Sequence, residues 1–238
     1  MKERDLQATI RAARIAGASY LLMSLTGFFS IIVVGRALIV AGDATATAHN
    51  ILASETLFRV GIVSELVSAT LFIFTALALF RLLGGVNKTL AWLMVALLVV
   101  AVPISFLNVL NELAALALLR GADFLSVFPR QQLDAQAMLF LELHRQGIVV
   151  ASIFWGLWLL PFGLLVIRSG FIPRILGVLL IAACLGYLGN SLTLLLVPGS
   201  GQVIGQVAVI LEIAGETPII AWLLIKGATP QRSAAPAP

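Results

Sequence analysis

The chain has 238 residues, of which 61% are hydrophobic and 11% are charged, and its formal net charge at pH 7 is +4. A soluble domain is about 45–50% apolar and about 25% charged, so the composition excludes an ordinary soluble domain and predicts a polytopic membrane protein. The lysines and arginines lie singly at the ends of apolar segments, which excludes nucleic acid and makes the lipid bilayer the expected partner.

Six apolar segments are close to the roughly 20 residues that a helix needs to cross a bilayer. The first follows Arg11 and Arg14 and is too long for the apolar part of a signal peptide, so we expect a retained transmembrane helix. Pro103 lies inside the overlong third segment, where it predicts a kink or an end that emerges from the membrane. The expected spans are residues 15–35, 60–80, 89–119, 147–167, 175–197 and 203–225.

Three further prolines indicate where helices bend or begin. Pro161 and Pro218 lie inside the fourth and sixth spans, where we expect bends of the kind that membrane helices tolerate. Pro173 follows Gly170 and is typical of a helix start, so it predicts the beginning of the fifth span.

The first two connections on one side of the membrane are long enough to contain short helices. In residues 36–59, Asp43 is a good N-cap for a helix that runs through Ala44–Phe58 into the second span. In residues 120–146, several side chains recur at helical spacing. The expected fold is therefore all-α: a polytopic bundle of six transmembrane helices plus two short amphipathic helices that pack on the outer face. The recurring side chains in the second connection are Leu133, Ala137, Phe140, Leu141 and His144.

Lysines and arginines are unevenly distributed between the two sides of this bundle. Ten of the fifteen lie in the amino-terminal segment, the short connections and the tail, and five lie in the long connections. This excess predicts that both termini are cytoplasmic. The expected organisation is a cytoplasmic segment (1–14), a transmembrane domain (15–226) and a disordered cytoplasmic tail rich in Ala and Pro (227–238).

Four glutamates in the apolar segments are the main functional clue in the sequence. A carboxylate in hydrocarbon is unfavourable, so it faces a bundle interior, pairs with a partner or stays protonated. The helical rise gives heights above the cytoplasmic ends of the helices: roughly 24 Å for Glu65 and Asn190 and roughly 21 Å for Glu212. Glu216 lies roughly 15 Å from its end, near the midplane. We expect a ligand-binding or proton-linked site open to the outer face, with a structural hydrogen-bond network between helices as the equal alternative. The expected binding residues are Glu65, Asn190, Glu212 and Glu216.

Glu112, the fourth glutamate, differs from the other three in depth. It follows Lys88 by 24 residues, which is roughly 36 Å along a straight helix and places it at the outer interface. Arg59 and Arg145 reach similar heights, so we expect interfacial ion pairing among Arg59, Glu112 and Arg145.

A metal-dependent intramembrane hydrolase is an alternative, and it requires histidine or carboxylate ligands with an open position for water. His49 and His144 are the only histidines, and both fall in the expected outer connections. Glu142 and His144 are two residues apart and lie on different helix faces, so a Glu/His site would have to assemble from distant segments. Cys184 is the only cysteine, which excludes an intrachain disulfide and cysteine-cluster metal sites.

Motifs for other chemistry are missing from the sequence. It contains no Gly-x-Ser-x-Gly, no Walker A motif and no dinucleotide-binding fingerprint. We therefore assign no catalytic residue, expect no cofactor and favour binding over catalysis.

Several short motifs together resemble a known family. They are Arg14-Ile-Ala-Gly17, the stretch 50–59, the stretch 168–177 and Gly186-Tyr187. In combination, over about residues 10–226, they resemble the bacterial integral membrane family called domain of unknown function 4386. The resemblance implies a multi-helix protein of the bacterial inner membrane, and it brings no catalytic residues.

The leading functional prediction is therefore a membrane protein that binds or transports a small molecule or lipid through a carboxylate-lined cavity in the outer half of the bundle. Proton-linked transport is one form that this function can take. The alternatives are the metal-dependent intramembrane hydrolase and a non-catalytic membrane assembly or structural partner.

Overall fold

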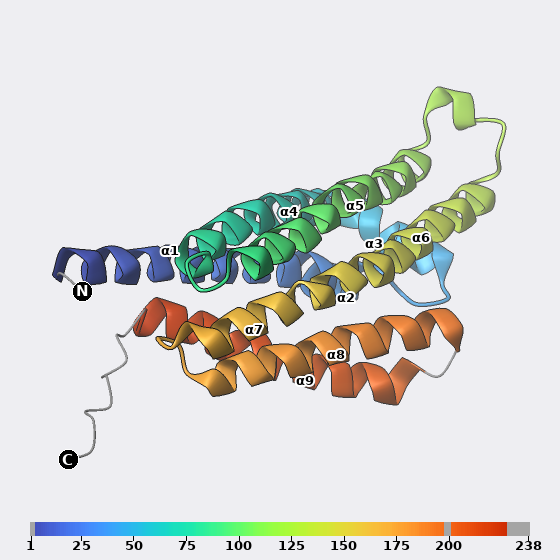
Figure 1. Cartoon of the computed structure of the whole chain (residues 1–238). Coiled ribbons are helices and arrows are strands. Elements are labelled where there is room, and N and C mark those ends of the chain that lie inside the picture. Colours follow the sequence, from blue (N-terminus) through green and yellow to red (C-terminus); the bar gives the residue numbers. More distant parts are fainter. Residues whose placement is uncertain (1–2, 198–200, 228–238) are drawn as a thin grey trace, which may run out of the picture. The chain divides into compact units, whose positions relative to one another are not determined.

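The computed structural model describes residues 3–197 and 201–227, and all secondary structure within them is helical (Figure 1). All but the first residue of the predicted tail (227–238) lies outside the described residues. In chain order, the elements are α1 (Glu3–Phe28), the π-helix η1 (Phe29–Val34), α2 (Gly35–Leu38), α3 (Ala44–Ala53), α4 (Glu55–Leu83), α5 (Lys88–Arg120), the 3₁₀ turn η2 (Asp123–Leu125), α6 (Arg130–Leu157), α7 (Leu159–Ser169), α8 (Arg174–Leu196) and α9 (Gly201–Ile225).

Six helical segments of the described chain are long and apolar enough to cross a membrane. Each overlaps one of the predicted spans, so the prediction of a six-span helical protein is confirmed at the level of helix length and composition. The segments are Gln7–Leu38, Glu55–Leu83, Lys88–Arg120, Arg130–Ser169, Arg174–Leu196 and Val203–Ile225.

The two short amphipathic helices are not confirmed as predicted. α3 is a separate helix, and Asp43 caps it as expected by accepting a hydrogen bond from the N–H of Ala46 at 2.8 Å. The prediction that this helix runs on into the second span is wrong, because α3 ends at Ala53, before α4 begins. The second predicted helix is not separate, because α6 runs without a break from Arg130 to Leu157. Residues 130–146 are too polar to count as a span, yet they contain no proline and many good helix formers, so the helix continues into the apolar segment.

A proline explains the single interruption within the fourth span. Pro161 has no N–H to donate to the carbonyl of Leu157, and α6 ends at that residue. Trp158 bridges the two helices: its N–H donates to the carbonyl of Phe154 at 3.2 Å, and its carbonyl accepts the N–H of Phe162 at 3.3 Å. The chain therefore continues in helical conformation from α6 into α7.

The other predicted proline effects differ from one another. Pro173 immediately precedes α8, as expected for a helix start, and Gly170 ends α7 with a positive φ of 72°. Pro103 and Pro218 lie inside α5 and α9, and both helices continue through them. Neighbouring groups in a membrane bundle can satisfy the carbonyl that such a proline leaves free.

The chain folds into two compact units, each with its own internal packing. Unit 1 comprises Met1–Leu21, Ile73–Val100 and Ser152–Pro238, and unit 2 comprises Leu22–Phe72 and Ala101–Ala151. Helices α1, α4, α5 and α6 contribute residues to both units.

In unit 1, α7, α8 and α9 pack in sequence against one another through small residues (Figure 1). Gly163 of α7 and Gly177 of α8 face each other so closely that a Cβ on either would lie 2.5–2.6 Å from the carbonyl oxygen of the other. A Cβ on Gly215 of α9 would lie 2.5 Å from Ala183 Cβ of α8. Membrane helices often associate in this way, because small residues let the backbones approach.

Unit 2 contains a hydrophobic core drawn from η1, α2, α3, α4, α5 and α6. Gly61 of α4 allows this core to close against η1, since a Cβ there would lie 3.0 Å from a methyl group of Val34. Buried core residues include Val34, Leu38, Ile51, Phe58, Ile62, Val109, Leu116, Leu119, Leu133 and Leu141. The same helices also carry buried ionisable side chains, which form the candidate site.

Candidate metal centre

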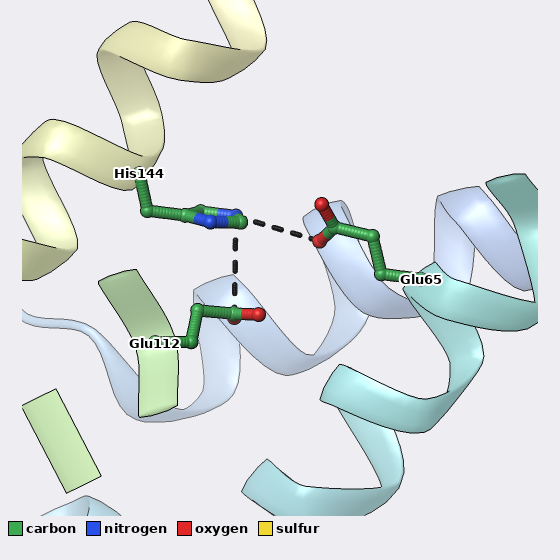
Figure 2. Close-up of side chains that lie close together, drawn as sticks. All are labelled: Glu65, Glu112 and His144. Carbon is green, nitrogen blue, oxygen red and sulfur yellow. Dashed lines mark ion pairs between the residues drawn. The ribbon is translucent and has the colours of Figure 1, made fainter. Parts of the chain in front are cut away.

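Three buried ionisable side chains of unit 2 converge from three helices: Glu65 of α4, Glu112 of α5 and His144 of α6 (Figure 2). Their exposed fractions are 7%, 9% and 8%. One ligand atom from each lies within 4.8 Å of the others. Figure 2 shows the edge of the imidazole directed toward both carboxylates, with Nε2 of His144 3.4 Å from Oε2 of Glu65 and 4.0 Å from Oε1 of Glu112.

Both separations are longer than the contact in a close ion pair, and one of them matches the spacing of two ligands that share an ion. A charge-assisted N–H···O bond has a donor–acceptor distance of about 2.7–2.9 Å, and both separations are longer. Two atoms that each bind one zinc ion at about 2.0–2.2 Å in tetrahedral geometry lie roughly 3.4 Å apart. The 3.4 Å separation between His144 and Glu65 matches this value, and the 4.0 Å separation between His144 and Glu112 is longer.

The orientation of His144 is set by a reciprocal contact with Asn108 of α5. The Nδ1 atom of His144 lies 3.3 Å from the backbone carbonyl of Asn108, and the Asn108 side-chain amide donates to the backbone carbonyl of His144 at 2.9 Å. A carbonyl only accepts, so this contact places a ring proton on Nδ1 and directs Nε2 toward the carboxylates. Histidines that bind metals usually have this arrangement, in which the second nitrogen donates to a backbone carbonyl or a carboxylate.

One oxygen of the cluster has no hydrogen-bond partner among the described residues. Oε2 of Glu112 is buried and unpaired. Buried polar atoms nearly always have a partner, because a carboxylate oxygen removed from water without one is strongly unfavourable. A bound cation would satisfy this atom.

The fourth element of the site is η1, the π-helix near the end of the first span. The hydroxyl of Ser30 in η1 lies 3.5 Å from Oε2 of Glu65. π-Helical turns are rare and occur often at functional sites. The irregular turn therefore lies directly beside the cluster.

A cavity of about 350 Å³ in unit 2 reaches this cluster. Glu112, His144 and Ser30 line it, together with Arg36 of α2 and a mainly aliphatic wall. Two of the three candidate ligands therefore border a space large enough for a small ligand.

In unit 1, Glu216 of α9 is held by two tyrosines. The hydroxyl of Tyr187 on α8 donates to Oε1 at 2.8 Å, and the hydroxyl of Tyr20 on α1 donates to Oε2. Tyr20 is fully buried against Trp158 and Phe162. Both oxygens of this glutamate therefore link α9 to other helices, as in the structural network that the sequence left open.

Of the other predicted binding residues, Asn190 and Glu212 lie in unit 1 and Glu65 lies in unit 2. Glu212 is half-buried one turn before Glu216, within electrostatic range of it. Asn190 of α8 is opposite Gly205 of α9, and its Oδ1 would be 3.5 Å from a Cβ there. A ligand site shared by Glu65, Asn190, Glu212 and Glu216 stays a prediction.

The arginines expected beside Glu112 have other partners. Arg59 binds Glu55 at 2.7 Å, and Arg145 binds both oxygens of Glu142. Each pair is three or four residues apart on one helix, where a partner is always within reach. The charged contact that the described residues provide for Glu112 is His144.

His144 is a possible ligand in the metal alternative, but the sequence does not predict that it lies beside Glu65 and Glu112. The sequence prediction places it in an outer connection, because the predicted fourth span begins at residue 147. The available signal is its helical register with Leu133, Ala137 and Leu141, all of which are buried on α6. That register places His144 on the buried face of the helix.

Loss of one tyrosine hydroxyl should weaken unit 1 measurably. Tyr187→Phe keeps the ring but removes the donor to Oε1 of Glu216, so we expect the free energy of unfolding to fall by about 1–2 kcal/mol. Denaturant titration of the detergent-solubilised protein measures it. A double-mutant cycle with Glu216→Gln is the control, and additive effects would show that the two side chains are not coupled.

The sequence matches a family of known proteins but no individual curated protein or solved structure. A family model matches residues 15–227, which is most of the chain, and confirms the resemblance inferred from the short motifs. The chain therefore belongs to the family described as Domain of unknown function (DUF4386).

Proposed function

We propose that this chain is a multi-pass membrane protein that binds a divalent transition-metal ion, such as zinc, at Glu65, Glu112 and His144. The observation that carries the proposal is the convergence of these three buried side chains from three helices. The orientation of the imidazole and the unpaired oxygen of Glu112 support it.

The ligand set favours a catalytic ion over a structural one. Structural zinc sites in proteins have four protein ligands, whereas catalytic sites have three and leave a fourth position for water. Imidazole and carboxylate ligands suit zinc and related ions, and two carboxylates balance a charge of +2. Since Glu112 and His144 border the cavity, the fourth position is accessible to a bound molecule. Hydrolysis by metal-activated water is the reaction class that this arrangement supports.

Two other roles for the buried glutamates are less well supported. A metal-free ion network, with a charged His144 between Glu65 and Glu112, would be expected to show shorter contacts than 3.4 Å and 4.0 Å. A carboxylate-lined binding or transport site at Asn190, Glu212 and Glu216 is less well supported, because both oxygens of Glu216 already accept hydrogen bonds from tyrosine hydroxyls. That contact pattern favours a structural role in unit 1.

The membrane location belongs to the same proposal. The excess of lysine and arginine on one side, ten against five, supports cytoplasmic termini. In that orientation, the metal centre lies in the outer half of the bacterial inner membrane.

Metal loading tests the proposal directly. The tag-free protein is purified in detergent, stripped with a chelator and dialysed against zinc, and bound metal is measured by elemental mass spectrometry. We expect about one ion per chain for the wild type. Glu112→Gln and His144→Ala should each weaken zinc binding at least as much as loss of an outer-shell partner does, by about 10–100-fold.

The matched controls are the other histidine and a neighbouring glutamate of α4. His49→Ala and Glu55→Gln should retain wild-type zinc, because neither residue belongs to the cluster. A wild-type protein that binds no zinc, manganese or iron would overturn the proposal. Equal loss of metal in the controls would also overturn it, because it would show that the ion is not held at the cluster.

A further inference from the structure

The cavity beside the candidate metal centre has a wall suited to a hydrocarbon chain. Its volume, about 350 Å³, is at the lower end of the usual range for small-ligand sites, about 300–1,000 Å³. Aliphatic side chains from η1, from the segment after α2 and from α6 form most of the wall. They include Ile31, Ile32, Ile39, Met138, Leu141 and Ile148. A polar ligand would lose its hydration against such a wall without compensation, whereas an apolar chain would not.

The same cavity carries one basic side chain without an acidic partner. Arg36 of α2 lines it, and it forms no ion pair with any described residue. Arg145 also lines the cavity, but Glu142 occupies its guanidinium. A guanidinium group binds carboxylate or phosphate oxygens with two parallel hydrogen bonds. Arg36 is therefore the group that would recognise an anion in this space.

The position of Arg36 in the chain matches the position of a lipid head group. It lies close to the end of the first span, Gln7–Leu38, where arginines reach the membrane–water interface. Residues of η1, the turn that precedes it in the same span, form part of the aliphatic wall. A basic group at the end of a span with an apolar wall next to it is complementary to an amphiphile.

We propose that this cavity binds a single-chain amphiphile with an acidic head group, held at Arg36, with its chain along the aliphatic wall. The acidic group can be a carboxylate or a phosphate. The amphiphile is the substrate class of the metal centre, and in this respect the inference rests on the proposed function. A cavity of this volume accommodates one chain rather than two.

Native mass spectrometry of the detergent-solubilised, zinc-loaded protein tests the inference. The probes are palmitate, palmitoyl lysophosphatidylglycerol, methyl palmitate and inorganic phosphate. We expect one palmitate or one lysophospholipid per chain, binding of methyl palmitate weaker by about tenfold, and no binding of phosphate. Tenfold corresponds to about 1.4 kcal/mol, within the usual contribution of a hydrogen bond to a charged group.

Two variants locate the binding, and each has a matched control. Arg36→Gln should reduce palmitate binding to the level of methyl palmitate, and Ile32→Trp should abolish it by filling the cavity. Arg11→Gln changes an exposed arginine of α1, and Ile15→Trp enlarges an exposed apolar residue of the same helix, so both should bind palmitate normally. Zinc content is measured on every preparation.

The outcomes separate this inference from the proposed function. If zinc loads normally but palmitate does not bind, or binds equally well to Arg36→Gln and Ile32→Trp, the inference is overturned and the metal centre stands. If palmitate binding depends on Arg36 while no metal loads, the amphiphile site is supported and the proposed function fails. Equal binding of methyl palmitate, or binding of phosphate alone, would overturn the assignment of an acidic amphiphile.

Discussion

Chelation is expected to lower the melting temperature of the wild-type protein by about 8–16 °C. An ion that binds only the native state stabilises that state by about 4 kcal/mol when its free concentration is about 1,000 times its dissociation constant. For a chain of this size, each kcal/mol changes the melting temperature by about 2–4 °C. Scanning fluorimetry of the detergent-solubilised protein in buffered zinc, with and without chelator, measures the change.

His144→Ala distinguishes the cluster from other sites that could bind the ion. The variant lacks the nitrogen ligand, so chelator should shift its melting temperature less than it shifts that of the wild type, and His49→Ala should show the full wild-type shift. An equal shift in His144→Ala would mean that the stabilising ion binds elsewhere. A wild-type protein insensitive to chelator would identify the cluster as a network of protein side chains alone.

Most of the fold is predictable from the sequence, because a bilayer admits only apolar helices of about 20 residues or closed barrels. The predicted fifth span, 175–197, and sixth span, 203–225, differ from the observed segments by at most one residue at either end. The missed continuity of α6 has a physical cause. Hydropathy detects where a helix enters hydrocarbon, and residues 130–146 are too polar for that signal although they are helical.

A different limit explains why the convergence of the three side chains is not predicted from the sequence. The unfavourable burial of carboxylates identifies Glu65 and Glu112 as unusual, but their heights come to roughly 24 Å and 36 Å along separate straight helices. The structure brings them together with His144, with ligand atoms within 4.8 Å of one another. Helical rise measures distance along one helix, and the tilt and offset of neighbouring helices depend on packing that no single segment encodes.

The partners of Glu216 illustrate the remaining limit. Its position in an apolar segment makes it a candidate binding residue, and nothing local distinguishes a free carboxylate from one that is already satisfied. Tyr20 and Tyr187 are 196 and 29 residues away from it in sequence. Such long-range contacts follow from tertiary structure and have no periodic signal.

The second large effect is expected from a residue that is not a candidate ligand. Gly147 of α6 faces Asn108, and a Cβ there would lie 1.9 Å from Oδ1 of Asn108. The Asn108 side chain has little freedom to move, because it donates to the His144 carbonyl at 2.9 Å and accepts from Asn111 at 3.2 Å. Gly147→Ala should therefore displace His144 and lower zinc affinity by about 10–100-fold, the range for lost outer-shell support. Competition with a chromophoric chelator measures this affinity.

The direction of this effect separates tertiary packing from local helix preference. Alanine is a better helix former than glycine by about 0.8–1.0 kcal/mol, so if local preference dominated, Gly147→Ala would be more stable and would bind zinc normally. Gly35→Ala is the matched control, because a Cβ there meets no atom within 4 Å. Combining Gly147→Ala with Asn108→Ala removes the atom that the new methyl group meets, so the double variant should bind zinc more tightly than Gly147→Ala alone. A double variant that binds no better would mean that Gly147 acts on the metal centre by a route other than contact with Asn108.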